Sequence, residues 1–276
     1  MPGHAVPRLT NVNKSEEQAR AALANLAGDG IAAPLLPAPG PGITRASLAD
    51  GSAMAAIRAS APASMQLRSE PELLQSLAET LQGHDLQDGL YVFGYGSLMW
   101  NPAFLYQEAL TATVRGWSRK FCLWLYLARG SLQAPGLMLS LDRGGTCRGM
   151  VFRIPAAMVQ EELQLLWRRE MLSGAYQARW VTATVAGQSV KALTFVINRR
   201  HERYARHLSD EQIAHYIATG TGTLGTCQDY FDATVTKLQA LGIRDAAIER
   251  IRSAVERRAT GASGADCRPS GRSPSR

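Results

Sequence analysis

The stretch Val92-Phe93-Gly94-Tyr95-Gly96-Ser97-Leu98-Met99-Trp100-Asn101-Pro102 joins a short apolar run to a turn with two glycines. Asn101-Pro102 stops the strand, because proline lacks an amide proton and restricts the residue before it. The glycines allow unusual backbone angles, so the amides of Gly96, Ser97 and Leu98 can converge on one small anion such as a carboxylate. A plain glycine turn after any strand fits the same spacing. The pattern lacks the third glycine of a dinucleotide fingerprint and the Gly-Lys-Ser/Thr of a phosphate loop.

Short apolar segments follow this turn and predict strands. They cover residues 90–93, 111–114, 121–125, 137–141, 149–154, 180–185 and 190–197. Gly116 separates the second segment from the third, and both Arg143-Gly144-Gly145 and Ala186-Gly187-Gln188 are hairpin signals. Strands this short favour a small closed or curled sheet over a parallel doubly wound one.

Helical signals lie before, between and after these strands. The expected helices cover residues 70–82, 155–171, 209–218, 228–241 and 245–258. Pro155 suits the first turn of its helix, and Ser209-Asp210-Glu211-Gln212 is a capping box. Gly242 is typical of a left-handed C-cap.

The two ends of the chain differ from its middle in composition. Residues 1–68 are rich in Ala, Pro and Gly and predict a disordered extension, because such a stretch buries too little apolar surface to offset the entropy of ordering. Residues 69–88 are expected to hold a short helix and a linker, residues 89–258 a folded domain, and residues 259–276 a disordered basic tail. Translation could start at Met1, Met54 or Met65, and the sequence leaves this open.

The net charge of +7 invites a nucleic-acid function, but its distribution argues against one. Residues 257–276 hold five basic side chains and one acidic one, and residues 1–60 hold five and four, which leaves only +2 for residues 61–256. No stretch approaches the ~20 apolar residues that span a bilayer, and no secretory signal is present. We therefore expect a cytoplasmic protein with neither nucleic acid nor membrane as partner. The oligomeric state is not readable.

Metal and thiol chemistry have weak support in the sequence. The four cysteines are scattered without a Cys-x-x-Cys pair, and Cys122 and Cys147 fall within apolar runs that predict ordinary buried thiols. His201, His207 and His215 are spaced by six and eight residues, so the three do not share one helical face. We expect neither a metal site nor a cofactor.

A carboxylate stands where the helix over residues 155–171 should be apolar. The stripe of this helix consists of Val159, Leu163 and Leu166, with Trp167 at its edge. At about 100° per residue, Glu170 falls within about 20° of that stripe. Glu161 and Glu162 are instead expected to face solvent.

A partly buried glutamate can serve as an acid and a base. Removal from water disfavours the charged carboxylate and raises its pKa, which brings proton exchange closer to neutral pH. A structural alternative stays open, in which the helix ends at Glu170 and its side chain reaches water or pairs with Arg169 or Arg200.

Four blocks in the same order give the chain a resemblance to a known family. The blocks are residues 93–102, Gly116-Trp117-Ser118-Arg119-Lys120-Phe121-Cys122, Leu166-Trp167-Arg168-Arg169-Glu170-Met171 with Gly174 and Tyr176, and Gly222-Thr223-Leu224-Gly225-Thr226 leading to Tyr230. From about Gly89 to about Val255 the chain resembles ChaC-type γ-glutamylcyclotransferases, which cleave glutathione. The resemblance implies an α+β fold, a small closed or curled mixed β-barrel flanked by helices.

The resemblance also implies site residues and a reaction. Glu170 would be the catalytic acid and base, the turn Tyr95-Gly96-Ser97-Leu98 would hold the γ-glutamyl unit, and Tyr230 would line the pocket. In glutathione the free α-amine attacks the γ-carbonyl and releases 5-oxoproline and Cys-Gly. Since the nucleophile belongs to the substrate, no serine, cysteine, metal or activated water is required.

Several alternatives remain at this stage. Tyr230, Tyr95 and Tyr176 could be packing residues. The enzyme could act more broadly on γ-glutamyl amino acids or γ-glutamylamines, since only the pocket for the departing amine would differ. Proteins of this kind have also been labelled cation-transport regulators, a non-catalytic role for which the sequence shows neither an amphipathic basic helix nor a lipidation motif.

Overall fold

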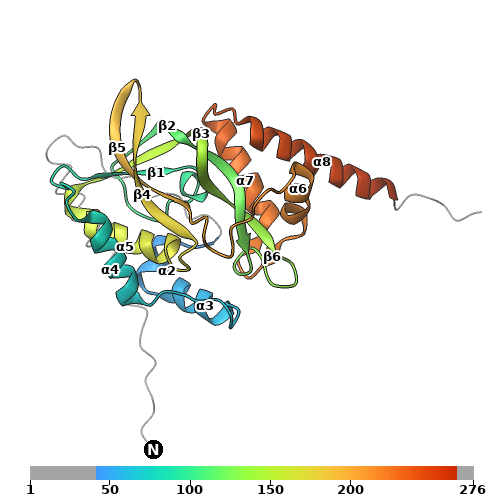
Figure 1. The fold of residues 1–276 in the computed structure, drawn as a ribbon, viewed down its shortest axis with the longest axis horizontal. Helices are drawn as coiled ribbons and strands as arrows, with labels where there is room; N and C mark the ends of the chain where they lie inside the picture. The colour runs from blue at the N-terminus through green and yellow to red at the C-terminus, as the bar shows by residue number, and fades with distance from the viewer. Residues whose placement is uncertain (1–41, 266–276) are drawn as a thin grey trace, which may run out of the picture.

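The computed structural model describes residues 42–265, in which five long strands close into a barrel (Figure 1). The strands are β1 (Leu90–Gly94), β2 (Glu108–Leu125), β3 (Gly136–Ile154), β4 (Tyr176–Val185) and β5 (Gln188–Ile197). Neighbours pair antiparallel in the order β1-β3-β2-β4-β5, and a parallel pairing between β5 and β1 closes the ring. The predicted fold class, a small closed mixed barrel flanked by helices, is confirmed.

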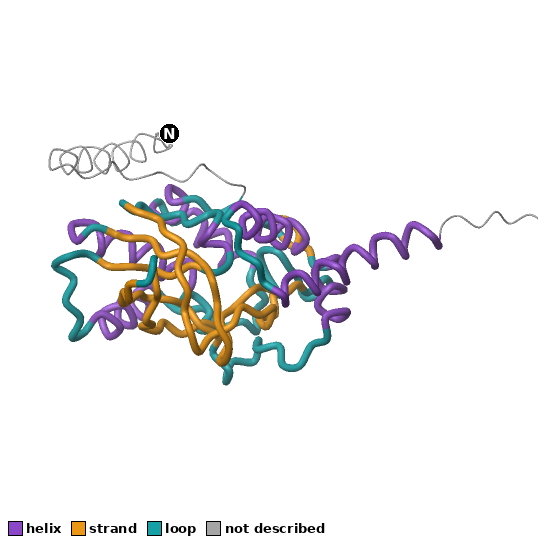
Figure 2. Tube along the Cα trace, turned by 90° about the horizontal axis from the view of Figure 1, so that it is seen from above, coloured by secondary structure: helices purple, strands orange, loops and turns teal. Residues whose placement is uncertain are grey.

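Helices cover the barrel on two sides, as Figures 1 and 2 show. One group consists of α2 (Arg45–Ala49), α3 (Ser52–Ser60), α4 (Glu70–Leu81) and α5 (Val159–Glu170). The other consists of α6 (Asp210–Thr219), α7 (Cys227–Ala240) and α8 (Ala246–Ala265). Short elements complete the chain: the 3₁₀ turns η2 (Ser97–Met99) and η3 (Ala156–Met158), and the pair β6 (Thr221–Gly222) and β7 (Gly225–Thr226).

The hairpin predicted at Arg143-Gly144-Gly145 is wrong, and so is the strand break at Gly116. Both positions lie inside continuous strands, where Arg115 pairs with Thr146 and Trp117 with Arg143. Gly116, Gly144 and Gly145 have φ angles of 81°, 96° and 78°. Because these glycines face one another across the β2–β3 pair, they form a β-bulge at which both strands bend together. The bend helps the sheet to close instead of reversing the chain.

The second predicted hairpin is confirmed. Val185 pairs with Gln188, which leaves a two-residue loop at Ala186 and Gly187. Both loop residues have positive φ, 47° and 86°, as a type I′ turn requires.

Helix starts and ends follow the sequence signals closely. Capping boxes begin α4 at Ser69, α6 at Ser209 and α7 at Thr226. Gly242, with φ of 62°, follows α7. The helix expected over residues 155–171 begins as the 3₁₀ turn η3, and its α-helical part ends at Glu170.

The disorder predicted for residues 1–68 is wrong for residues 42–68, which we call the strap. The strap contains α2 and α3 and packs against the barrel domain, with Leu48 1% exposed. Few apolar residues suffice here because they cover a core that already exists instead of building their own. The predicted disorder of residues 1–41 lies outside the described residues.

The strap also corrects the expectation for Glu162, which was to face solvent. Glu162 is fully buried because Arg45 of α2 covers it, with Arg45 Nη2 2.6 Å from Glu162 Oε1. The amide of Leu105 donates a further hydrogen bond to Glu162 Oε2, at 2.9 Å. Burial raises the pKa of Glu162, an effect that the Arg45 guanidinium opposes. Glu161 is 55% exposed, in line with its prediction.

At the other end of the chain, the first half of α8 packs against the body through buried residues such as Ile248 and Ile251, and its C-terminal end projects from the molecule (Figures 1 and 2). It continues to Ala265, so the disorder expected from residue 259 is wrong as far as residue 265. Residues 266–276 lie outside the described part. Within residues 42–265, no helix combines the length and the apolar character that crossing a membrane requires.

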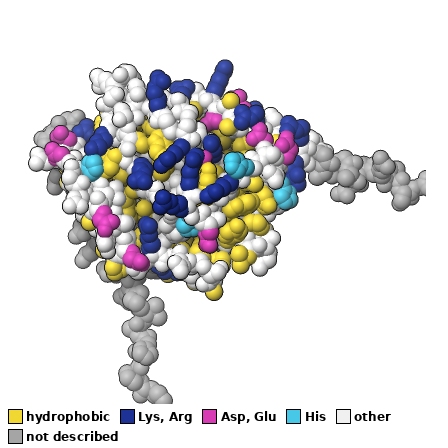
Figure 3. Space-filling view, in the orientation of Figure 1, with side chains coloured by type: hydrophobic (Ala, Val, Ile, Leu, Met, Phe, Trp, Pro, Cys, Tyr) yellow, Lys and Arg dark blue, Asp and Glu magenta, His cyan; other side chains and the backbone are white. Residues whose placement is uncertain are grey.

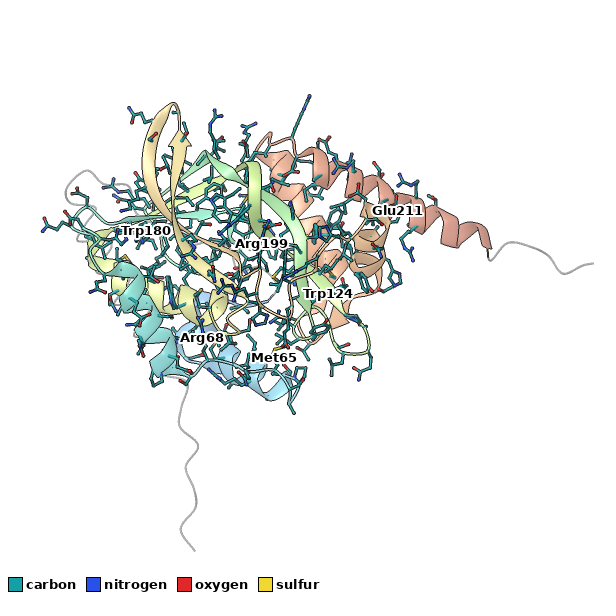
Figure 4. The ribbon with its side chains drawn as sticks, viewed as in Figure 1. Met65, Arg68, Trp124, Trp180, Arg199 and Glu211 are labelled. Atoms are coloured by element: carbon teal, nitrogen blue, oxygen red, sulfur yellow. The ribbon has the colours of Figure 1, made fainter. Side chains whose placement is uncertain are left out.

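Basic side chains gather over the middle of the face seen in Figure 3. Arg199 is labelled at the centre of the same view in Figure 4, and with Lys120 it pairs with the buried Asp142. The oxygens of Asp142 lie 2.6 Å from Arg199 Nε and 3.1 Å from Lys120 Nζ. Burial alone would raise the pKa of Asp142, but the hydrogen bonds from Arg199 and Lys120 lower it to about 2. Part of this basic surface is therefore internally neutralised.

Candidate functional site

The glycine turn leaves β1 at one end of the barrel and continues into η2. Gly96 has φ of −133° and ψ of −126°, a combination that residues with a side chain rarely adopt, which agrees with the expectation for this glycine. Gly94 belongs to strand β1 and does not need such angles. Both glycines are also needed for space. A Cβ on Gly96 would lie 2.8 Å from the hydroxyl of Tyr230, and one on Gly94 would lie 3.0 Å from the Cβ of Leu98.

The backbone of the turn presents its amides at the start of η2. Within the part of the chain that the structure describes, three backbone amides of η2 and its flanking residues donate hydrogen bonds. They belong to Met99, Trp100 and Asn101. The amides of Gly96, Ser97 and Leu98 make none there. Three neighbouring donors at a helix start are able to receive an anionic oxygen.

Glu170 is the last residue of α5, and the helix carries it to the same end of the barrel. Its side chain is 12% exposed, and its Oε1 lies 3.1 Å from Nε of Arg169. Burial raises the pKa of Glu170, and the Arg169 charge opposes that rise. The open alternative from the sequence is thus half right: Glu170 does pair with Arg169, but it does not reach bulk water.

Arg169 connects the glutamate to the turn. Its Nη2 donates to Ser97 Oγ at 2.8 Å, and its Nη1 donates to the carbonyl of Asn101 at 2.7 Å. One guanidinium therefore fixes the relative positions of Glu170, Ser97 and the residue that precedes Pro102.

Three buried tyrosines surround the carboxylate. Tyr95 donates to the carbonyl of Phe195 at 2.7 Å, and Tyr176 donates to that of Leu139 at 2.8 Å. Tyr230 lies in the first turn of α7 and is 2% exposed. Burial raises the pKa of all three, and the Glu170 charge adds to the rise, so the phenols stay neutral and act as hydrogen-bond donors.

A narrow pocket brings the predicted residues together. Its lining includes all six of them: Tyr95, Gly96, Ser97, Leu98, Glu170 and Tyr230. Tyr176, which the sequence favoured as a packing residue, lines it too. We call this space the inner pocket. It is narrow: its space is about 280 Å³ counted with its open mouth, and only about 10 Å³ of this can hold the centre of a water-sized molecule.

The inner pocket opens into a larger cleft, which we call the outer cleft. The two share Ser97, Met138, Glu170, Tyr176 and Tyr230. The outer cleft comprises about 940 Å³ including its open mouth, and many of its lining residues are apolar. Four strap residues line it as well: Gly42, Ile43, Ile57 and Leu67. A ligand with a small head and a longer tail would fit this shape.

The outer cleft contains two buried arginines that sequence reasoning missed. Arg203 is 4% exposed and donates to the carbonyl of Trp124 at 2.8 Å and to Ser173 Oγ at 3.0 Å. Within the described residues no carboxylate pairs with it, and burial lowers its pKa. Arg129 is 8% exposed, and its nearest acid is the exposed Asp229 at 3.9 Å. No local pattern marks either residue, because the β2–β3 loop and the segment after β5 meet only in the fold.

The cysteines that the structure describes are buried. Burial raises the pKa of Cys122 to about 12 and of Cys147 and Cys227 to about 11, which disfavours thiolates. Cys267 lies outside the described residues. Residues 42–265 contain no cluster of three or more His, Cys, Asp or Glu that could hold a metal ion.

The comparisons with known proteins all point to one family. The model of the family described as ChaC-like protein matches residues 90–258. A glutathione-specific gamma-glutamylcyclotransferase of Escherichia coli is 40% identical over 171 residues, which is 62% of this chain and 74% of that protein. Glutathione-specific gamma-glutamylcyclotransferase 1 of Mus musculus is 32% identical over 187 residues, 65% of this chain and 84% of that protein.

A solved structure shares the fold. The crystal structure of a γ-glutamyl cyclotransferase specific to glutathione from yeast matches with a TM-score of 0.58 at 18% identity, over 62% of this chain and 96% of that one. At this identity the likeness shows the barrel architecture and nothing finer.

Proposed function

The chain belongs to the ChaC-like protein family, and from this premise we propose that it converts glutathione into 5-oxoproline and Cys-Gly. The observation that carries the proposal is the inner pocket, in which Glu170 lies out of bulk solvent beside the glycine turn. The match covers 74% and 84% of the two relatives that are named for this activity, which supports the same substrate.

The inner pocket offers polar groups that suit a γ-glutamyl unit. The unpaired amides at the start of η2 are donors for its α-carboxylate, which leaves the α-amine near Glu170. Holding both ends of the unit favours the folded geometry in which the amine reaches the γ-carbonyl.

Glu170 accounts for the proton transfers. Its carboxylate takes a proton from the α-ammonium group, and the free amine attacks the γ-carbonyl and forms the ring C–N bond. The bond to the cysteinyl nitrogen breaks as Glu170 returns its proton to that nitrogen. The second proton on the ring nitrogen leaves to solvent, and the new amino group of Cys-Gly takes one up. The raised pKa of Glu170 brings both transfers closer to neutral pH.

The outer cleft suits the departing Cys-Gly. Its apolar walls can pack against the cysteinyl part, and the guanidiniums of Arg129 and Arg203 can attract the glycine carboxylate. A buried cation without an acid partner is costly, so a carboxylate that pairs with Arg203 gains more than one at an exposed arginine.

The test is to incubate the purified full chain, without any partner, with glutathione. Chromatography should show 5-oxoproline and Cys-Gly in equal amounts. Glu170→Gln should lower kcat by about 10²–10⁴-fold, whereas Glu249→Gln, an exposed change in α8, should leave it unchanged. Wild-type protein that leaves glutathione intact would favour the non-catalytic alternative, and equal turnover of γ-glutamyl amines would favour the broader enzyme.

A further inference from the structure

The strap lies outside the part of the chain that matches the family, yet it forms one wall of the outer cleft. The family model begins at residue 90, whereas Gly42, Ile43, Ile57 and Leu67 line the cleft together with Ser97, Arg169, Glu170 and Tyr230. Figure 4 labels Met65 and Arg68 of the strap beside α2 and α3 (compare Figure 1).

Strong contacts hold the strap in place. Arg45 reaches Glu161 and the buried Glu162 with one guanidinium nitrogen, 2.6 Å from each. The carbonyl of Leu48 accepts a hydrogen bond from Arg168 at 3.0 Å. The strap is therefore fixed along the length of α5, the helix that ends at Glu170.

Two further contacts reach the residues on either side of Glu170. The amide of Arg68 donates to the carbonyl of Leu172 at 2.8 Å. Asn101 donates through Nδ2 to the carbonyl of Ile43 at 2.9 Å, while its own carbonyl accepts from Arg169. Ile43 and Leu67 are thus held at fixed positions relative to the carboxylate.

The inner pocket cannot choose among γ-glutamyl substrates, because it receives the part that they share. Selection has to come from contacts with the departing amine. In the outer cleft those contacts include three apolar strap side chains, Ile43, Ile57 and Leu67. Binding energy gained away from the reacting atoms can be used to hold the substrate in its reactive geometry, so such a wall acts on kcat/KM.

We propose that the strap is a specificity element, in which Ile43, Ile57 and Leu67 form the wall that packs against the Cys-Gly portion of glutathione. The inference rests on the proposed function and adds to it the place where the departing dipeptide is recognised. The strap thereby makes the family domain of this chain dependent on residues that the family model does not include.

Helix α3 offers a matched pair of variants. Ile57 and Met54 are each 8% exposed and both are buried against the core, but only Ile57 lines the cleft. Both Ile57→Ala and Met54→Ala introduce alanine, a good helix former, at a buried position of α3. Their effects on the stability of the strap should therefore be similar.

The experiment incubates the protein with a mixture of glutathione and γ-glutamylalanine and measures the release of Cys-Gly and of alanine. Cys-Gly reports the turnover of glutathione, and alanine reports that of γ-glutamylalanine. Ile57→Ala should lower kcat/KM for glutathione by about 10-fold or more, within the range for a lost apolar contact, and change that for γ-glutamylalanine much less. Met54→Ala should keep the wild-type ratio. If wild-type protein does not turn over γ-glutamylalanine, the inhibition constant of γ-glutamylalanine against glutathione turnover is compared in place of kcat/KM.

Two results would overturn the assignment. One is an Ile57→Ala protein with the wild-type preference for glutathione. The other is a Met54→Ala protein whose preference shifts as far as that of Ile57→Ala, since the strap would then act only through stability. A wild-type chain that releases no 5-oxoproline from glutathione would instead refute the proposed function itself, before any variant is compared.

Discussion

Arg45 and Glu162 form a buried ion pair across 117 residues of sequence, with Arg45 Nη2 2.6 Å from Glu162 Oε1. The pair fastens the strap to α5 and so joins a segment outside the matched family region to the helix that carries Glu170. A buried pair contributes little against an apolar alternative, but the loss of one partner leaves an uncompensated charge.

Arg45→Met should lower the free energy of unfolding by about 3–5 kcal/mol at neutral pH, measured by urea unfolding. The pKa of Glu162 is already raised and would rise further without Arg45, so the deficit should shrink at acid pH as that carboxyl becomes protonated. Adding Glu162→Gln should recover part of the loss, because the amide oxygen still accepts from Leu105. A deficit no larger than that of the exposed control Arg115→Met would show that the pair does not hold the strap.

The acid limb of kcat/KM should follow Glu170, which must be ionised to accept the ammonium proton. Burial raises the pKa of Glu170 above its ordinary value near 4.5, and Arg169 opposes the rise. Arg169→Met should therefore move the acid limb to higher pH, while Arg169→Lys should leave it nearer the wild-type position. The distant, exposed Arg148→Met serves as a control for charge loss. An acid limb that stays in place in Arg169→Met would speak against Glu170 as the titrating base.

Gly96→Ala should destabilise the turn, because its Cβ would come within 2.8 Å of the Tyr230 hydroxyl. Overpacking of this kind typically costs about 1–3 kcal/mol. Tyr230→Phe removes the crowded oxygen, so in thermal unfolding the double variant should lose less than the two single variants added together. Simple additivity would mean that the close approach to Tyr230 is not the reason for glycine at this position.

Asp142 should govern stability in acid. Its pKa of about 2 in the folded protein lies below the ordinary value of 3.8, so it contributes stability that is present above about pH 4 and lost as the pH falls through about 2. Asp142→Asn should cost about 2 kcal/mol at pH 6 and progressively less toward pH 2. Urea unfolding at several pH values measures the difference, with the exposed Asp88→Asn as control. A cost that does not vary with pH would exclude the carboxylate charge as its source.

Arg203→Met should raise KM for glutathione by about 10-fold or more, the range expected for a lost hydrogen bond to a charged group. The glycine ethyl ester of glutathione lacks the carboxylate, so the same variant should change its KM little. Arg206→Met, an exposed change three residues away, should affect neither substrate. Equal effects on glutathione and its ester would place the carboxylate elsewhere, for which Arg129 is the next residue to test.

Local signals singled out residues that line the inner pocket, for identifiable reasons. The turn after β1 and the displaced carboxylate on α5 are both short-range patterns, and the four family blocks fixed which residues belong together. That Glu170 and the turn meet depends on the barrel, since α5 crosses from β3 to β4 and returns to the end of β1. The resemblance to the family predicted that Glu170 and the turn lie together, which helical periodicity alone could not predict.

The amino-acid sequence by itself determined which segments are extended, the helix caps, the tight hairpin at Ala186-Gly187 and the position of Glu170 along its helix. These depend on residues within a few positions of one another. Tertiary structure decided the rest. Glycines at positive φ serve a hairpin and a bulge equally well, so only the pairing of β2 with β3 shows that Gly116 and Gly144-Gly145 bend the strands together. Likewise the strap, Glu162 and Arg203 owe their burial to partners about 80 or more residues away, and no local composition reveals a surface that another part of the chain will cover.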